Sequence, residues 1–351
     1  MKIVAIIIGA IALFRSPFGA FMYPTVSMYL LIHLVFKMGA TMLLAYHVAK
    51  INKWVGGMIA VGAISLMHPV YSNFSDTYLF LMVCYGIVYM SVQQGNKDHL
   101  FTAMRVFVIV HVFSCVLQYL GISTPWVPAE PGRVEGLMGN LNGASGAIAL
   151  CIPLFFKKPW LYLLPVPVLG LFLINSSGGM IGSFFAGMIY IWMVDVEYKK
   201  QIAYGSVLLI VCFFIFYDTP NIMHRSECWQ RVFPIYFNGL DVKFQKLLGV
   251  GIGNWKLFNQ VSIQAGNITP GWDRLHNVFL QGFMEMGFPF LILLTGYVIT
   301  TLKRLREPLY LSALGAIWVV CMGNSVFHQN AINGMFIVIW LGLIGRNLRR
   351  I

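Results

Sequence analysis

The strongest constraint on the fold is a succession of long apolar segments separated by short polar stretches. About twelve such segments lie near 3–14, 26–48, 55–72, 77–94, 100–120, 143–156, 160–175, 177–194, 202–217, 277–300, 309–327 and 331–346. About 17–25 apolar residues are enough to cross a bilayer as a helix. Only 10% of the 351 residues are charged, against about 25% in soluble domains. We therefore predict an all-α, polytopic membrane protein of about twelve transmembrane helices.

Basic residues fall almost entirely on one side of this topology. With the N-terminus inside, the inside loops carry Lys2, Lys50, Lys53, Lys97, Lys157, Lys158, Lys199, Lys200, Lys303, Arg304, Arg306, Arg346, Arg349 and Arg350. The short outside loops carry only Arg15 and Arg133. Positive residues are enriched in cytoplasmic loops, so both termini are predicted to be cytoplasmic. The same bias accounts for the net charge of +12 without nucleic acid as a partner.

One polar segment, about 218–276, is too long for a simple connection between helices. It falls outside in this topology, as does a shorter loop at about 121–142. We expect 218–276 to be a large extracytoplasmic loop that carries the functional site of a single membrane domain, 1–351. The six cysteines show no CxxC or Cys/His pattern, so neither a disulfide framework nor a zinc site is predicted.

The stretch RLHNVFLQGFMEMG, residues 274–287, places Arg274, His276 and Asn277 at the mouth of an apolar segment. A helix N-terminus offers unpaired N–H groups and partial positive charge, which favour a nearby phosphate. The same field disfavours an imidazolium, so a neutral His276 able to accept a proton is expected. His276 is a candidate general base. The alternative is an interfacial histidine that hydrogen-bonds a loop carbonyl.

Glu285 lies nine residues after His276, inside the same apolar segment. At a rise of ~1.5 Å per residue it would be ~14 Å deep, where carboxylates are costly and usually face the protein interior. Nine residues at about 100° each would place the two side chains on opposite faces of one helix. Glu285 is therefore predicted to hold a neighbouring segment, through Lys37 or Arg105, rather than to act on His276.

The stretch HRSECWQRVFPIYF, residues 224–237, begins the large loop. Arg225 and Trp229 share a face if the backbone is helical, and Glu227 precedes Arg231 in the favourable order for an ion pair. Arg225 has no such partner in sequence, and a guanidinium matches phosphate oxygens well. We predict that Arg225 binds an anion; the alternative is contact with lipid headgroups.

Three glycine-rich stretches have different expected roles. GVGIGNW, 249–255, lacks the Lys-Ser/Thr of a P-loop, so its glycines are expected to allow a tight turn or close approach to substrate. GLMGNLNGASGA, 136–147, contains Asn140 and Asn142, which cap a helix or bind sugar hydroxyls. SSGGMIGSFFAG, 176–187, spaces small residues as helix–helix contacts do.

The order of these motifs resembles the bacterial O-antigen ligase and O-antigen polymerase superfamily. The motifs that carry the resemblance are Arg225-x-x-x-Trp229, Gly249 to Trp255, His276-Asn277-x-Phe279-Leu280 and Glu285-x-Gly287, together with the Gly-x-x-x-Asn-x-Asn element in 136–147. It covers about residues 136–300, while the first five segments match only in hydropathy. Many relatives have Ser-Arg-Gly where this chain reads Ser176-Ser177-Gly178-Gly179, so one phosphate contact is either missing or supplied by Arg231 or Arg274.

The resemblance implies a GT-C-like glycosyltransferase of the bacterial inner membrane that needs no metal, nucleotide sugar or other cofactor. Such enzymes move a glycan from an undecaprenyl-diphosphate carrier to an acceptor hydroxyl at the outer membrane face, as in lipopolysaccharide biosynthesis. The acceptor stays open among lipid A-core, a growing polymer and a protein side chain. The implied site has His276 and Arg225 as catalytic residues, Arg231, Arg274, Asn277, Asn142, Gly251 and Trp255 as substrate-binding residues, and Glu285, Trp229 and Gly287 as supporting residues. A transporter is the alternative class, although neither the internal repeats nor the broken helices at matched positions that are typical of transporters are seen in the sequence.

Overall fold

The computed structural model describes residues 28–65, 73–123, 133–194, 199–215, 247–255, 275–323 and 331–348, together with Ser226, Trp229, Gln230 and Pro234. All regular secondary structure in these residues is helical, which confirms the all-α prediction. The elements are α2 (Met28–Ile51), α3 (Lys53–Ser65), α4 (Asn73–Gln94), α5 (Lys97–Tyr119), α6 (Leu141–Cys151), η1 (Ile152–Phe155), η2 (Trp160–Leu163), α7 (Pro165–Ile174), α8 (Ser177–Met193), α9 (Lys199–Ile215), α13 (Val278–Arg304), α14 (Pro308–Gly323) and α16 (Ala331–Leu348).

Each predicted apolar segment from 26–48 onward coincides with helical structure, apart from shifts of several residues at the ends. The segment 3–14 lies outside the described residues. Two segments are composite, because 143–156 is built from α6 and η1, and 160–175 from η2 and α7. Two described helices, α5 and α13, are long and apolar enough to cross a membrane by length and composition, and several others are apolar but shorter.

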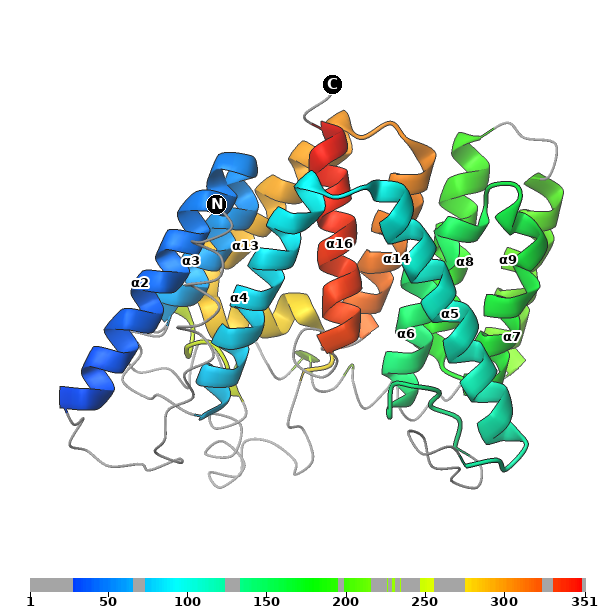
Figure 1. Ribbon diagram of the computed structural model, residues 1–351, viewed down its shortest axis with the longest axis horizontal. Coiled ribbons are helices and arrows are strands. Elements are labelled where there is room, and N and C mark those ends of the chain that lie inside the picture. The colour runs from blue at the N-terminus through cyan, green and yellow to red at the C-terminus, as the bar shows by residue number, and fades with distance from the viewer. Residues whose placement is uncertain are drawn as a thin grey trace. The chain divides into compact units, whose positions relative to one another are not determined.

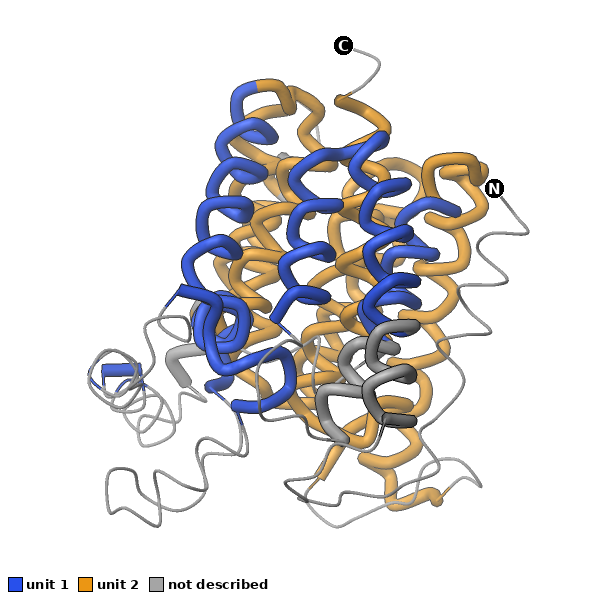
Figure 2. The backbone as a smooth tube through the Cα atoms, turned by 90° about the vertical axis from the view of Figure 1, so that its left-hand side faces the viewer, with its two compact units in different colours: residues 1–91, 223–303 blue, residues 92–222, 304–351 orange. Residues whose placement is uncertain are grey.

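The chain divides into two compact units, each formed from two separate stretches of sequence (Figure 2). Unit 1 comprises residues 1–91 and 223–303, and unit 2 comprises residues 92–222 and 304–351. The boundary falls within α4, after Ser91, and again near the end of α13. The large loop predicted to carry the site begins in unit 2 and continues into unit 1, which holds the described part of the candidate site.

Within unit 2, α6 is the central helix (Figure 1), because every residue from Gly143 to Cys151 is buried. Its small side chains admit close neighbours, and those neighbours donate hydrogen bonds to its carbonyls. Asn333 of α16 donates to Gly143 at 3.0 Å, and the Trp340 indole donates to Leu150 at 2.7 Å. The two contacts show that α16 runs parallel to α6.

α5 runs antiparallel to α6 in the same unit. His111 lies 3.3 Å from the carbonyl of Ala144, and the Arg105 guanidinium donates to the carbonyl of Leu154 at 3.1 Å. The two contacts follow one another in opposite order along α5 and along the stretch formed by α6 and η1. The start of α5, at Lys97, therefore lies at the same end of unit 2 as the turn that follows η1.

Three connections meet at that end, which we call the basic end of unit 2. Arg346 donates to the carbonyl of Gly95 at 2.5 Å, and Asn347 donates to the carboxylate of Glu307 at 2.9 Å. Exposed basic residues of the same connections are Lys97, Lys157, Lys158, Arg304 and Arg306. Loops far apart in sequence, all predicted to lie inside, thus share one end of the unit.

α8 packs against α6, α9 and α14 through small residues, as its sequence predicted. A Cβ added to Gly179 would overlap α6, and one added to Gly187 would overlap α9. Gly182 lies against α6 and α14. Gly178 has no neighbour within 4 Å, so the packing contact expected there is made by the next residue instead.

Within unit 1, α3 and α13 are antiparallel. A Cβ on Gly57 would meet Leu293, and a Cβ on Gly296 would meet the ring of Trp54. The N-terminus of α3, with its exposed Lys53, therefore lies beside the C-terminal part of α13. The C-terminus of α3 lies at the opposite end of the unit, where the candidate site begins.

Candidate functional site

α13 is broken at Gly287, where the backbone is non-helical with φ of 69° and ψ of −160°. Two residues later Pro289 lacks an N–H group, so the carbonyl of Glu285 has no helical donor four residues ahead. The turn at Gly287 also removes the helical donor for Met284. Figure 1 shows the N-terminal part of α13 turned away from the rest. We call this part, residues 278–286, the half-helix.

The glycine loop, residues 249–255, fills this break with its own backbone. The N–H of Val250 donates to the carbonyl of Met284 at 2.8 Å, and the N–H of Gly251 donates to the carbonyl of Glu285 at 3.0 Å. Buried carbonyls without donors are costly. The loop therefore supplies the hydrogen bonds that the broken helix cannot make for itself.

Glycine is required on both sides of this contact. Gly249 has φ of +78°, and a Cβ there would meet the backbone of Glu285. Gly287 has φ of +69°, and a Cβ there would meet the carbonyl of Leu247. The tight turn predicted for Gly249 to Gly253 is confirmed, since Gly251 and Gly253 also have positive φ. The close approach is to the backbone of α13.

The other side of the glycine loop is fixed to α3. The N–H of Ile252 donates to the hydroxyl of Ser65 at 3.2 Å, and that hydroxyl donates to the carbonyl of Gly62 at 2.8 Å. Trp255 follows at the end of the loop and is 1% exposed. Trp255 and Gly251 were predicted to bind substrate, and that role stays a prediction; Trp255 is buried, and the N–H of Gly251 is bonded to α13.

His276 lies immediately before the half-helix in a left-handed conformation, with φ of 49°. The next residue, Asn277, caps the helix. Its Oδ1 accepts from the N–H groups of Phe279 and Leu280 at 3.0 and 3.1 Å, as an N-cap residue does. His276 is half-buried, while Asn277 is buried. Asn277 was predicted to bind substrate, and that role stays a prediction; its Oδ1 caps the half-helix.

The prediction that His276 and Glu285 lie on opposite faces of one helix rested on a wrong boundary. The helix begins at Val278, so His276 is not part of it and the angle of about 100° per residue does not relate the two. Glu285 is buried, as predicted, and its carboxylate accepts from the amide of Gln281 at 3.1 Å.

Of the two partners proposed for Glu285, Arg105 belongs to unit 2. Its guanidinium donates to the carbonyl of Leu154 and lies 4.5 Å from the ring centroid of Trp160. Lys37 belongs to unit 1, as Glu285 does, and is buried. A role for Lys37 in holding Glu285 stays a prediction.

The large loop reaches the residue that precedes His276. The indole N–H of Trp229 donates to the carbonyl of Leu275 at 2.8 Å. This bond brings Trp229 to the mouth of the half-helix. Trp229, His276 and Asn277 are therefore neighbours in the fold. The three arginines predicted to contact phosphate, Arg225, Arg231 and Arg274, lie outside the described residues.

Asn140 and Asn142 have separate structural partners in unit 2. Asn140 caps α6, since its Oδ1 accepts from the N–H of Gly143 at 3.0 Å; the capping prediction is confirmed for this residue. The Oδ1 of Asn142, predicted to bind substrate, accepts from the hydroxyl of Ser176 at 3.1 Å. Asn142 thus ties the start of α6 to the start of α8.

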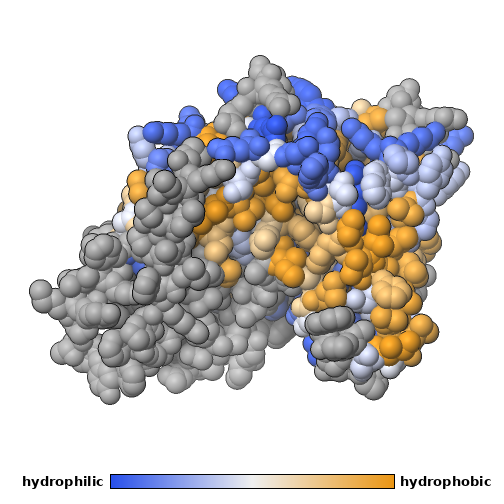
Figure 3. Space-filling model, viewed as in Figure 1, coloured by the Kyte–Doolittle hydropathy of each residue, from blue (hydrophilic) through white to orange (hydrophobic). Residues whose placement is uncertain are grey.

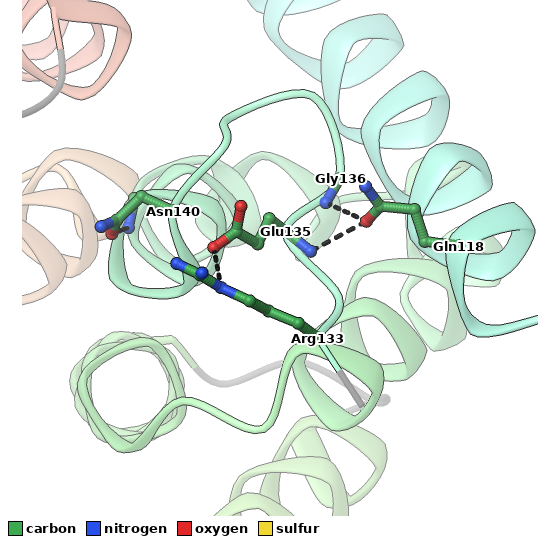
Figure 4. A network of polar contacts seen from close by, with 6 residues as sticks. Gln118, Arg133, Glu135, Gly136 and Asn140 are labelled. Carbon is green, nitrogen blue, oxygen red and sulfur yellow. Dashed lines mark hydrogen bonds and ion pairs between the residues drawn. The ribbon is translucent and has the colours of Figure 1, made fainter. Parts of the chain in front are cut away.

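Sequence reasoning missed a polar clamp at the other end of α5. The Oε1 of Gln118 accepts from the N–H groups of Glu135 and Gly136, both at 2.8 Å (Figure 4). Arg133 and Glu135 form an ion pair at 2.5 Å in the same loop. His111 is fully buried and accepts from the N–H of Leu137 at 3.0 Å. The sequence feature that could have indicated this clamp is the pair His111 and Gln118, which lie two turns apart on one face of an apolar helix.

In the described part of the chain, no group of three or more His, Cys, Asp or Glu side chains is placed to hold a metal ion. No protein-family model matches the chain, and no curated protein matches it.

Proposed function

We propose that this chain is a membrane glycosyltransferase of the O-antigen ligase type. It transfers a glycan from an undecaprenyl-diphosphate carrier to an acceptor hydroxyl at the outer face of the bacterial inner membrane. The observation that carries the proposal is the Trp229–Leu275 hydrogen bond. It brings Trp229, from one motif behind the family resemblance, beside His276 and Asn277, from another, at a capped helix N-terminus. The resemblance is the other support.

Exposed apolar faces support a membrane setting. On α5, Val106, Val110 and Phe113 follow helical spacing and are 49%, 47% and 62% exposed. Further exposed apolar residues at such spacings are Tyr204, Val207, Leu208 and Val211 on α9, Phe185, Met188 and Trp192 on α8, and Ile292, Ile299 and Leu302 on α13. Apolar faces of this extent are unusual on water-soluble monomers. Lipid chains are the contact that suits them.

The distribution of charge supports the proposed orientation. The basic end of unit 2 carries loops predicted to be cytoplasmic, and the clamp at Gln118 lies at the opposite end of α5. Figure 3 shows hydrophilic atoms at one end of the helices and hydrophobic atoms along their sides, in the right-hand part where α5 and α7–α9 lie. We propose about twelve spans with both termini cytoplasmic, in keeping with the positive-inside bias.

The proposed reaction needs a proton acceptor and a site for a leaving diphosphate. His276 takes the proton from the acceptor hydroxyl as the acceptor oxygen bonds to the anomeric carbon of the glycan. The bond between that carbon and the phosphate oxygen breaks, and undecaprenyl diphosphate leaves with the electron pair. Arg225, with Arg231 or Arg274, and the N-terminus of the half-helix stabilise the charge that develops on the diphosphate.

In this mechanism, the break in α13 allows the half-helix to point in a direction of its own. In a continuous helix, the dipole at the N-terminus would point along the axis of the whole span. The half-helix has a different axis, because the backbone turns at Gly287. The glycine loop stabilises this turn by hydrogen bonds. Transporters use broken helices to bind ions and substrates. A broken helix is therefore compatible with both a glycosyltransferase and a transporter, and the transfer assay below distinguishes the two classes.

The test is a transfer assay in liposomes with undecaprenyl-diphosphate-linked glycan and each acceptor class, lipid A-core, polymer and peptide. We expect His276→Ala to lower transfer by about 10²–10⁴-fold and a chelator to leave it unchanged. His99→Ala is the matched control, because His99 is exposed on α5 in unit 2. Equal transfer by His276→Ala and wild type would remove His276 from the mechanism. No transfer by wild type with any acceptor would favour transport.

The role of Arg225 has its own test. Lysine keeps the positive charge but not the planar, bidentate geometry of a guanidinium. We expect Arg225→Lys to raise the KM for the lipid-linked donor. Full activity of this variant would show that Arg225 does not bind the diphosphate in a bidentate manner.

A further inference from the structure

We propose that Trp229 is a positioning residue for His276, acting through the carbonyl of Leu275. The inference rests on the proposed function, in which His276 accepts a proton. The family resemblance implied only that Trp229 is a supporting residue; the proposal specifies which residue it positions.

His276 needs positioning because its backbone is in a left-handed conformation, with φ of 49°. Residues with a Cβ disfavour this region, and it persists where the surroundings fix the flanking peptide groups. The group after His276 is fixed, because Asn277 is buried and caps the half-helix through two hydrogen bonds.

The peptide group before His276 is fixed by Trp229. That group consists of the carbonyl of Leu275 and the N–H of His276, which lie in one plane. Leu275 is 1% exposed, and its carbonyl accepts from the Trp229 indole at 2.8 Å. With both neighbouring groups held, the backbone angles of His276 are set. These angles determine where the Cβ and the imidazole begin.

The bond joins Trp229 to the peptide group that precedes the proton acceptor. Loss of the indole N–H should misplace the imidazole while leaving the groups that bind the donor in place. A positioning role therefore predicts a lower kcat with little change in KM.

The first test compares two substitutions that differ in a hydroxyl group. Trp229→Phe keeps an aromatic ring and removes the hydrogen-bond donor, whereas Trp229→Tyr retains an O–H donor. We expect Trp229→Phe to lower kcat by about tenfold to a hundredfold, with KM for the donor unchanged and Trp229→Tyr retaining more activity. Equal kcat for Trp229→Phe and wild type would overturn the proposal.

Trp340→Phe is the matched control. It removes an indole-to-carbonyl hydrogen bond of nearly the same length, 2.7 Å to Leu150, from the interior of unit 2. Loss of an indole hydrogen bond should lower the stability of both variants. We expect kcat per folded molecule to fall in Trp229→Phe alone. An equal fall in kcat in both variants would reduce Trp229 to a structural role.

A second measurement does not depend on activity. In a background in which the six native cysteines are replaced by alanine, the rate of thiol labelling of His276→Cys is compared with and without Trp229→Phe, and with and without Trp340→Phe. We expect a several-fold change with Trp229→Phe alone. An unchanged rate overturns the positioning role. A changed rate in a protein whose wild type transfers no glycan would sustain the positioning role and defeat the proposed function.

Discussion

The N–H of Gly251 donates a 3.0 Å hydrogen bond to the carbonyl of Glu285. This contact occurs where Pro289 deprives α13 of a helical donor. The glycine loop and the break in α13 are complementary in backbone geometry, although they are separate in sequence. Each is therefore expected to be stable only in the presence of the other.

The first prediction concerns Gly287. Alanine there must adopt φ of +69° and place its Cβ against the carbonyl of Leu247. Residues with a Cβ rarely combine φ of 69° with ψ of −160°, and this backbone conformation alone costs about 1–3 kcal/mol; the overlap adds to it. We expect Gly287→Ala to lower the thermal unfolding midpoint in detergent and to reduce transfer.

Gly121→Ala separates these two effects. Gly121 has a similar φ of +74°, and a Cβ there has nothing within 4 Å. It should show the cost of a positive φ without the overlap. A loss of stability for Gly287→Ala no greater than that for Gly121→Ala would argue against a tight contact between the glycine loop and the break.

The second prediction concerns the anchor of the glycine loop on α3. Ser65→Ala removes the acceptor for the N–H of buried Ile252, and an unsatisfied buried donor costs about 1–3 kcal/mol. Ser183→Ala is the control, because Ser183 is equally buried and its hydroxyl has no hydrogen-bond partner among the described residues. We expect a clear loss of stability for Ser65→Ala alone, measured by chemical denaturation. Matching midpoints for the two variants would contradict the anchor.

Hydropathy located the helices because each apolar segment must be buried or face lipid along its whole length. It did not locate the break in α13, since a change in backbone direction leaves hydropathy unaltered. The signal was present as Gly287 and Pro289, two residues apart within an apolar segment. A proline inside a helical pattern removes one backbone donor, and a glycine just before it permits the turn.

The candidate site was predictable in part for a similar reason. Side-chain chemistry marked His276 and Trp229, and the structure places the two near one another. The contact that joins them uses the carbonyl of Leu275, and every residue has a carbonyl. The sequence therefore had no means of indicating which one Trp229 binds. His111 and Gln118 were overlooked because polar residues inside an apolar segment were judged by charge alone.

The third prediction concerns the clamp at Gln118. Gln118→Ala leaves the N–H groups of Glu135 and Gly136 without their acceptor. Gln118→Glu keeps an oxygen at the same position. We expect faster proteolysis within residues 121–142 for the alanine variant, and rates near wild type for the glutamate variant in membranes oriented to expose this loop. Similar cleavage of both variants would show that Gln118 does not hold the loop.

The last prediction tests whether the diphosphate lies at the N-terminus of the half-helix. Asn277→Ala removes the cap and should cost about 0.5–2 kcal/mol of stability. Asn277→Ser and Asn277→Asp both keep an oxygen suited to capping, so both should fold as well as wild type. A carboxylate beside a bound diphosphate would repel it, and added salt would weaken that repulsion. We therefore expect Asn277→Asp to raise the KM for the lipid-linked donor in a salt-dependent manner, while Asn277→Ser transfers normally. Equal KM values for the serine and aspartate variants would place the diphosphate elsewhere, because a negative charge at the helix N-terminus would then have no anion to oppose.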